Sequence, residues 1–327
     1  MSSAPLEIER AFPGSQSQPS ELTVIIVSYN TRALTLKALE TLYATAADVP
    51  MRVVVWDNDS HDGSADAIAE HFPQAELIRS KDNIGFAAAN NRVAETITTE
   101  WMLLLNPDTE THAGAIQNLL AFSKAHPRAG ITGGRTVFPD GSLNIASCWR
   151  KLTPWSLFCS AFYLSYLFPK SELFNPEAMG DWQRDTVREV DIVVGCFLMI
   201  PTALWRELNG FDETYFMYGE EADLCLRAAR MGYRPMITPD AQIMHLVGAS
   251  STVFANKIIK IAKARATLVR DHWNPALVPL GIGLLWSWAA MRRLATEAAA
   301  RLKGKTEARD CWRTIWQDRR NWLAGYR

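Results

Sequence analysis

Residues 22–31 and 52–60 read LTVIIVSYNT and RVVVWDNDS, and together they decide the fold class. Each stretch begins with a short run of apolar, mostly β-branched residues and ends in polar residues. The first leads into a helical pattern over residues 32–46, and the second into a helical pattern that begins near Gly63. Because continuous apolar strands alternate with amphipathic helices, the sequence predicts a mostly parallel sheet covered by helices on both faces.

The same unit recurs further along the chain. A third short strand, residues 76–79, runs into Asn83-Ile84-Gly85-Phe86 and an alanine-rich helix, and WMLLL at residues 101–105 forms a fourth strand. Each of these strands is followed by polar residues at its carboxyl end. Open α/β sheets place their ligands at this edge, so we expect a polar site there.

The fourth strand ends abruptly in Asn106-Pro107-Asp108. Proline cannot continue the hydrogen bonding of a strand, so Asn106 and Asp108 are expected to project from its end. Asp108 could hold a hard divalent cation that bridges a pyrophosphate, and Asp57 could accept a hydrogen bond from a base or ribose. A turn and a helix cap are the structural alternatives for these residues.

Two common nucleotide-binding motifs are missing from the sequence. No GxGxxG follows the first strand, and no GxxxxGK[ST] is present, so a dinucleotide-binding domain and a P-loop NTPase both lack their phosphate-binding glycines. The five cysteines are scattered and form no CxxC pair, which argues against a disulfide framework or a zinc site and fits a reducing cytoplasm.

The segment GEEAD, residues 219–223, places Glu220, Glu221 and Asp223 at the start of a predicted helix. Acidic residues in a first turn stabilise a helix through its dipole, which is their structural interpretation. Adjacent carboxylates also repel one another, so a partly buried one would have a raised pKa, as a general base needs near neutral pH. Downstream, His245 ends another apolar run and is either structural or a metal ligand.

The rest of the chain divides by composition. We expect residues 1–20, rich in Ser, Pro and Gln, to form a disordered tail, residues 21–256 a catalytic domain, and residues 150–183 an aromatic-rich insertion within it. Residues 154–169 are uncharged and rich in aromatic side chains. They could lie in a membrane interface, close over a groove or form a buried helix.

The C-terminal residues 257–327 are basic, with fifteen Lys and Arg against five Asp and Glu, although the whole chain has a net charge of −1. Residues 273–291 are uncharged, but their prolines, glycines and tryptophans favour an interfacial segment over a membrane-spanning helix. A helical face that bears Trp312, Trp316 and Trp322 indicates binding to an anionic membrane surface. Packing on the catalytic domain, or a homodimer contact, is the alternative.

The ordered motifs resemble glycosyltransferase family 2, inverting enzymes of the GT-A fold, and most of all its bacterial rhamnosyltransferase-like branch. The resemblance covers roughly residues 22–255. Its stretches are VIIVSYN, VVVWDNDSHDGS, NIGFAAANN, NPD, GFDETYFMYGEEADLCLR and HLVGAS.

The resemblance implies a role for each matched residue. Asp108 becomes the principal ligand of Mg²⁺ or Mn²⁺, and His245 a second contact to that metal. The nucleotide-sugar site is implied to comprise Tyr29, Asn30, Asp57, Asn83, Gly85 and Asn106. In the family the second residue of a Glu-Asp pair is the base; here Glu221 stands in its place, so the assignment among Glu221, Glu220 and Asp223 stays open.

The resemblance therefore implies an α/β GT-A domain with a helical C-terminal extension. Its expected activity is the transfer of a sugar to a lipid-linked cell-envelope glycan. L-rhamnose, donated by dTDP-rhamnose, is the sugar that the resemblance favours. We expect a dTDP- or UDP-sugar donor, no nucleic-acid partner, and a cytoplasmic protein peripheral to the inner face of the cell membrane. A non-catalytic sugar-nucleotide-binding protein and a glycoside hydrolase are the alternatives.

Overall fold

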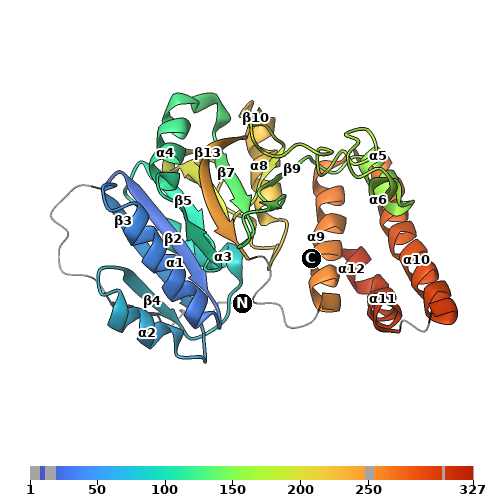
Figure 1. Cartoon of the computed structure of the whole chain (residues 1–327), viewed down its shortest axis with the longest axis horizontal. Helices are drawn as coiled ribbons and strands as arrows, with labels where there is room; N and C mark the ends of the chain where they lie inside the picture. Colours follow the sequence, from blue (N-terminus) through green and yellow to red (C-terminus); the bar gives the residue numbers. More distant parts are fainter. Residues whose placement is uncertain (1–7, 12–19, 247–253, 304–305, 327) are drawn as a thin grey trace.

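A central mixed sheet with helices on both faces forms the larger part of the protein, and helices from the C-terminal region stand beside it (Figure 1). The computed structural model describes residues 8–11, 20–246, 254–303 and 306–326. The main strands are β1 (Ile8–Ala11), β2 (Leu22–Ser28), β3 (Met51–Asn58), β4 (Glu76–Ser80), β5 (Trp101–Leu105), β7 (Thr132–Val137), β12 (Phe197–Pro201) and β13 (Met236–His245). Shorter strands are β6 (Thr109–Thr111), β8 (Leu143–Asn144), β9 (Cys148–Trp149), β10 (Arg188–Glu189) and β11 (Ile192–Val193).

The helices follow the strands in the predicted alternation. Those of the sheet region are α1 (Arg32–Thr45), α2 (Ser64–His71), α3 (Phe86–Ala94), α4 (Ala115–Ala125), α5 (Pro154–Ala161), α6 (Leu164–Leu167), α7 (Thr202–Glu207) and α8 (Glu220–Arg230), with a 3₁₀ turn at Pro127–Ala129. The C-terminal group is α9 (Phe254–His272), a 3₁₀ turn at Pro275–Leu277, α10 (Val278–Lys303), α11 (Glu307–Gln317) and α12 (Arg319–Ala324).

The sheet runs in the order β1-β4-β3-β2-β5-β12-β7-β13-β10. Strands β4, β3, β2 and β5 are mutually parallel, which confirms the predicted parallel core, while β12 is antiparallel to both of its neighbours. Val54 packs with α3, α7 and α8 on one face of the sheet, and Val55 packs with α1 and α4 on the other. Both faces are therefore buried, as the continuous apolar strands require.

The N-terminal segment corrects one expectation. Residues 8–11 form strand β1, which pairs antiparallel with β4, so they are not part of a disordered tail. The apolar alternation of so short a segment was too weak to predict a strand, because an edge strand gains most of its order from backbone hydrogen bonds to its neighbour. The other parts of the predicted tail, residues 1–7 and 12–19, lie outside the described residues.

The helices of the aromatic-rich insertion, α5 and α6, lie beside α10 (Figure 1). Thr153 caps α5 in a reciprocal pair of hydrogen bonds with Ser156, and Pro154 occupies the first turn, where a missing N–H costs nothing. Leu157 on α5 packs in a cluster with Leu285 and Trp322. The opposite side of the insertion faces solvent, so α5 is a packed helix with one open aromatic face.

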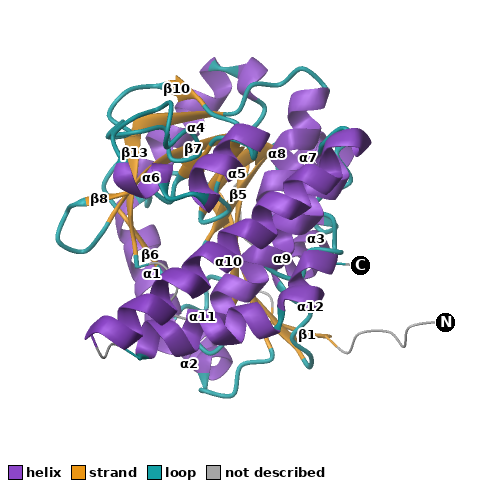
Figure 2. Ribbon diagram, turned by 90° about the vertical axis from the view of Figure 1, so that its right-hand side faces the viewer, coloured by secondary structure: helices purple, strands orange, loops and turns teal. Residues whose placement is uncertain are grey.

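The C-terminal helices pack on one another and on α5, as Figure 2 shows from the side. Trp322 is completely buried, and its indole N–H donates to the Ile315 carbonyl at 2.8 Å. The Arg292 guanidinium lies over the Trp288 and Trp312 rings, 5.0 and 5.7 Å from their centroids. Much of the predicted lipid-facing tryptophan surface is therefore used for packing. Among the described helices, none combines the length and apolar character needed to cross a membrane.

Candidate functional site

A cavity of about 730 Å³ opens at the carboxyl ends of β2, β3 and β5. It extends from these strand ends to the start of α8 and the first turns of α9. Eight of the predicted site residues line it, namely Tyr29, Asn83, Gly85, Asn106, Asp108, Glu220, Glu221 and His245. The structure thus brings residues from five separate sequence motifs to one place.

Asn30 and Asp57 adjoin lining residues in the chain but do not line the cavity themselves. The Asn30 side-chain oxygen accepts from the His61 N–H at 2.8 Å, and its own N–H donates to Ser60 at 2.9 Å. One oxygen of Asp57 accepts from the Ser60 N–H at 3.1 Å, whereas the other is buried with no hydrogen-bond partner in the described structure. Burial raises the pKa of this carboxyl. These two residues shape the loops, and Asp57 keeps one acceptor oxygen unused.

Asn58 is a pocket residue that the sequence analysis missed. Its amide donates to the Asn83 side chain at 3.0 Å, and its oxygen accepts from the Ile84 N–H at 3.0 Å. It therefore joins the end of β3 to the loop before α3 and holds Asn83 at the pocket wall. The signal was present in the quoted stretch, directly after Asp57, but an asparagine after a strand is equally typical of a turn.

Gly85 allows the loop before α3 to approach the segment before α8. It has φ +85°, and a Cβ at this position would lie 2.7 Å from the Phe216 carbonyl oxygen. That same carbonyl accepts the Phe86 N–H at 3.3 Å. Any other residue would push Phe216 away, so glycine is needed to bring the two walls of the cavity together.

Asp108 and His245 meet across the sheet. The pairing of β6 with β13 sets Thr109 opposite His245, and the His245 Nε2 atom lies 3.3 Å from Asp108 Oδ1. Burial alone would lower the pKa of His245, but Cys196 and the Asp108 carboxylate outweigh it and raise this pKa to about 10. The Nδ1 atom is buried without a partner among the described residues.

The described residues contain no group of three or more His, Cys, Asp or Glu side chains that would hold a cation unaided. A carboxylate and an imidazole on one edge still fit Mg²⁺ or Mn²⁺ once the cation displaces the proton of His245, since such ions are often held by one or two protein ligands together with substrate phosphates. The predicted motif HLVGAS is only partly described, because residues 247–253 lie outside the described part of the chain.

Glu220 and Glu221 begin α8 and line the same cavity. Each has an oxygen that is buried without a hydrogen-bond partner in the described structure. Burial raises the pKa of both carboxyls, and the charge of Glu221 raises that of Glu220 further, well above its ordinary range. Glu220 is almost fully buried, whereas Glu221 is partly exposed. The pair thus supplies one carboxylate suited to accept a proton from a ligand in the cavity.

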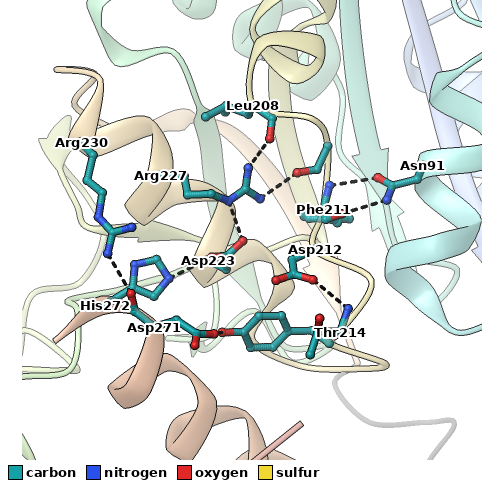
Figure 3. Close-up of polar contacts among 12 residues, drawn as sticks. Asn91, Leu208, Phe211, Asp212, Thr214, Asp223, Arg227, Arg230, Asp271 and His272 are labelled. Atoms are coloured by element: carbon teal, nitrogen blue, oxygen red, sulfur yellow. Dashed lines mark hydrogen bonds and ion pairs between the residues drawn. The ribbon is translucent and has the colours of Figure 1, made fainter. Parts of the chain in front are cut away.

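Asp223 does not line the cavity, and its carboxylate lies between Arg227 and His272 (Figure 3). It accepts from Arg227 at 2.7 Å, and its other oxygen lies 2.9 Å from His272 Nε2. Burial opposes ionisation, but these two partners hold the pKa of Asp223 below its usual value. Arg227 also donates to the carbonyls of Leu208 and Gly210. Asp223 therefore has the contacts of an anchor for α8 rather than those of a base.

Two basic residues at the cavity escaped the sequence analysis. Lys257 and Lys260 of α9 line the same cavity as the carboxylates. Their helix is amphipathic and lies outside the motifs that carry the family resemblance. From the sequence alone, its lysines therefore look like those on any solvent-exposed helix face.

The chain shares its sequence pattern with a known family. The model of glycosyl transferase family 2 matches residues 23–186, half of the chain. The chain belongs to this family. It is 28% identical over 240 residues to N-acetylglucosaminyl-diphospho-decaprenol L-rhamnosyltransferase of Mycobacterium tuberculosis, a match that covers 68% of this chain and 75% of the relative. It is also 28% identical over 250 residues to the rhamnosyltransferase WbbL of Escherichia coli, covering 72% and 88% of the two chains.

Solved structures support the fold. A mannosyltransferase from Pyrobaculum calidifontis, in complex with GDP-Man and Mn²⁺, aligns with a TM-score of 0.55 and 21% identity over 98% of this chain and 87% of its own. Staphylococcus aureus TarS in complex with UDP-GlcNAc aligns with a TM-score of 0.54 and 16% identity over 93% and 81%. The family member described here thus has the GT-A fold, and it is a glycosyltransferase, which decides against the two alternative functions.

Proposed function

We propose that this glycosyltransferase moves L-rhamnose from a nucleotide-sugar donor to a hydroxyl of a lipid-linked glycan. The proposed donor is dTDP-rhamnose, and the configuration at the anomeric carbon is inverted. The observation that carries the proposal is that Asp108 with His245, and Glu220 with Glu221, line one cavity. The names of the two rhamnosyltransferase relatives support the sugar and, for the mycobacterial enzyme, a diphospho-lipid acceptor.

Residues at the carboxyl ends of the strands would bind the donor. Asn83, which Asn58 holds in place, and Tyr29 form the wall toward which the nucleoside would lie. The unpaired oxygen of Asp57 adjoins this wall without lining it, so a small movement on donor binding would let it accept the ring N–H of a pyrimidine base. A buried acceptor without a partner costs about 1–3 kcal/mol, so filling it with a base N–H favours binding. Thymine and uracil both offer this donor.

Asp108 and His245 are the residues that would hold a divalent cation. Bound there, the cation would neutralise the charge that develops on the departing diphosphate. Asn106, which precedes Asp108 by two positions, completes this end of the donor site. The loss of the diphosphate and the attack of the acceptor then occur on opposite faces of the anomeric carbon.

Glu221 is the proposed base. The acceptor oxygen forms a bond to the anomeric carbon as the bond to the nucleoside diphosphate breaks, and Glu221 takes the proton of the acceptor hydroxyl. Its raised pKa suits proton transfer near neutral pH. Burial and the neighbouring Glu221 charge raise the pKa of Glu220 well above its ordinary range, so the pair favours a single negative charge.

We also propose that the protein works at a membrane surface, through the open face of the aromatic insertion. Tyr166, Leu167 and Phe168 are 78%, 62% and 49% exposed. The half-exposed rings of Phe158 and Phe162 pack against each other in a tilted arrangement, with centroids 4.8 Å apart. Exposed apolar patches of this kind mark membrane or partner contacts. The basic C-terminal helices next to the patch favour an anionic lipid surface.

A donor screen tests this function. Purified protein is incubated with dTDP-, UDP- and GDP-sugars and an N-acetylglucosaminyl diphospho-lipid acceptor, with Mg²⁺, with Mn²⁺ and with a chelator. We expect turnover with dTDP-rhamnose, inverted stereochemistry in the product and loss of turnover in the chelator. Turnover with another donor alone would overturn the rhamnose assignment.

A further inference from the structure

Lys257 and Lys260 present two positive charges to the cavity from one face of α9. Both are half-buried, and neither makes an ion pair with any residue that the structure describes. The Lys260 ammonium lies over the Phe216 ring, 5.8 Å from its centroid. Residues three positions apart lie on the same side of a helix, so the two ammonium groups can act on one ligand.

The two lysines lie on the side of the cavity that holds the proposed base. A Cβ on Gly219 would lie 3.0 Å from the Ala264 Cβ, so α9 passes directly against the start of α8. Lys260 precedes Ala264 by one helical turn, which is about 6 Å along the axis. Tyr326 strengthens this junction, since its hydroxyl donates to the Met217 carbonyl at 2.8 Å. The lysines therefore stand near Glu220 and Glu221.

The chemistry of this part of the cavity suits an amphiphilic anion. Ile259, Met217 and Trp149 line the cavity together with the lysines, so apolar surface adjoins the two cations. Ammonium groups bind phosphate oxygens through charge-assisted hydrogen bonds. The donor diphosphate already has Asp108, His245 and their cation in the proposed function, whereas these lysines have no assigned ligand.

We propose that Lys257 and Lys260 bind the diphosphate of the lipid-linked acceptor and thereby hold its sugar hydroxyl beside Glu221. This inference rests on the proposed function, because it supplies the recognition site for the acceptor of that reaction. Donor and acceptor share the diphosphate group. The position of the lysines beside the base assigns the acceptor, since in an inverting displacement the base and the acceptor lie on the same face of the anomeric carbon.

Binding of farnesyl diphosphate tests the assignment without turnover. Calorimetric titrations are made with the full chain while its donor site is saturated with dTDP or UDP, whichever the wild-type protein binds. Lys257→Gln and Lys260→Gln should each weaken farnesyl diphosphate binding about tenfold. Lys257→Arg and Lys260→Arg should retain most of it. Lys263→Gln, on the same helix but packed over Tyr326, is the matched control and should bind as wild type.

The outcomes separate the two diphosphates. Glutamine variants that bind farnesyl diphosphate more weakly but the nucleotide normally would support the acceptor site. If the wild-type protein nevertheless fails to transfer rhamnose, the proposed function fails while the acceptor site stands. Weakened nucleotide binding with unchanged farnesyl diphosphate binding overturns the inference and gives the lysines to the donor. Wild-type protein that binds no farnesyl diphosphate, or glutamine variants that bind it normally, also overturn it.

Discussion

His272 Nε2 lies 2.9 Å from Asp223 Oδ1, and this contact joins the end of α9 to the helix that carries the proposed base. Both side chains are nearly buried. The Tyr215 hydroxyl, which donates to Asp271 at 3.1 Å, and Arg230, which donates to the Asp271 carbonyl, brace the same junction. The C-terminal helices are thereby fixed to the catalytic wall, and the third carboxylate of GEEAD acquires a structural role.

Asp223→Asn should destabilise the protein while leaving its chemistry largely intact. Removal of the buried charge leaves Arg227 unpaired, so the free energy of unfolding should fall by about 3 kcal/mol. The pKa of Asp223 is lower in the folded than in the unfolded protein. Its contribution to the free energy of unfolding is therefore present above the unfolded pKa and is lost as pH falls through the folded pKa. Urea denaturation at pH 7 and pH 3 measures this difference. A fully folded variant without turnover would instead make Asp223 a participant in catalysis.

The parallel core and most of the donor wall were predictable from the sequence. Strand residues such as Val54 and Val55 are apolar on both sides, and polar residues follow each strand directly, so the pattern specifies both the sheet and its ligand edge. Asp108 and His245 were likewise predictable as members of known motifs. Their contact was not, because it depends on the antiparallel pairing of β6 with β13.

Other features depend on tertiary packing that a single sequence does not specify. Glu220, Glu221 and Asp223 look alike in sequence, but a helical step of about 100° per residue turns Asp223 toward His272 while the two glutamates face the cavity. Trp322 has the pattern of an interfacial residue, yet it is enclosed by α9, α10 and α5. Lys257 and Lys260 gain significance only from where α9 docks.

The metal assignment predicts unequal effects at Asp108 and His245. Asp108→Ala should abolish metal-dependent transfer without unfolding the protein, because its carboxylate is the proposed principal ligand. His245→Ala should raise the metal concentration needed more than it lowers the maximal rate. Titration of turnover with Mn²⁺, together with Mn²⁺ binding in the presence of the nucleotide, measures both. Glu110→Ala, two residues from Asp108 but outside the cavity lining, is the control. Unchanged turnover of Asp108→Ala would remove Asp108 from the site.

Glu220→Gln should stabilise the protein at alkaline pH. The folded pKa of Glu220 is raised, so the wild-type protein loses stability as pH rises above about 4.3, the ordinary value of the group, toward the folded pKa. Glutamine carries no charge and avoids this loss. In thermal unfolding, the melting temperature of the variant should exceed that of the wild-type protein at pH 8, and the difference should be smaller at pH 5. An equal gain at both pH values would mean that Glu220 does not titrate between them.

The membrane proposal predicts that the aromatic insertion, not only the basic tail, sets lipid affinity. Replacement of Tyr166, Leu167 and Phe168 by serine should weaken binding to vesicles of phosphatidylcholine and phosphatidylglycerol at least about tenfold, since each loses apolar burial. Binding should also weaken with salt. Leu294→Ser, at another exposed position, serves as the control. Deletion of the tail is less informative because Trp322 packs in the cluster with α5. Vesicle sedimentation that is unaffected by the triple change would contradict the proposal.

Glu221→Gln tests the central claim most directly, because it keeps the shape of the side chain and removes its basicity. Single-turnover transfer from dTDP-rhamnose is measured alongside donor affinity, with Glu220→Gln and Asp223→Asn as parallel variants. The account predicts that Glu221→Gln loses about 10²–10⁴-fold in turnover while binding the donor normally. Near-normal turnover of Glu221→Gln would contradict its assignment as the base, and normal turnover of all three variants would remove the carboxylate cluster from catalysis.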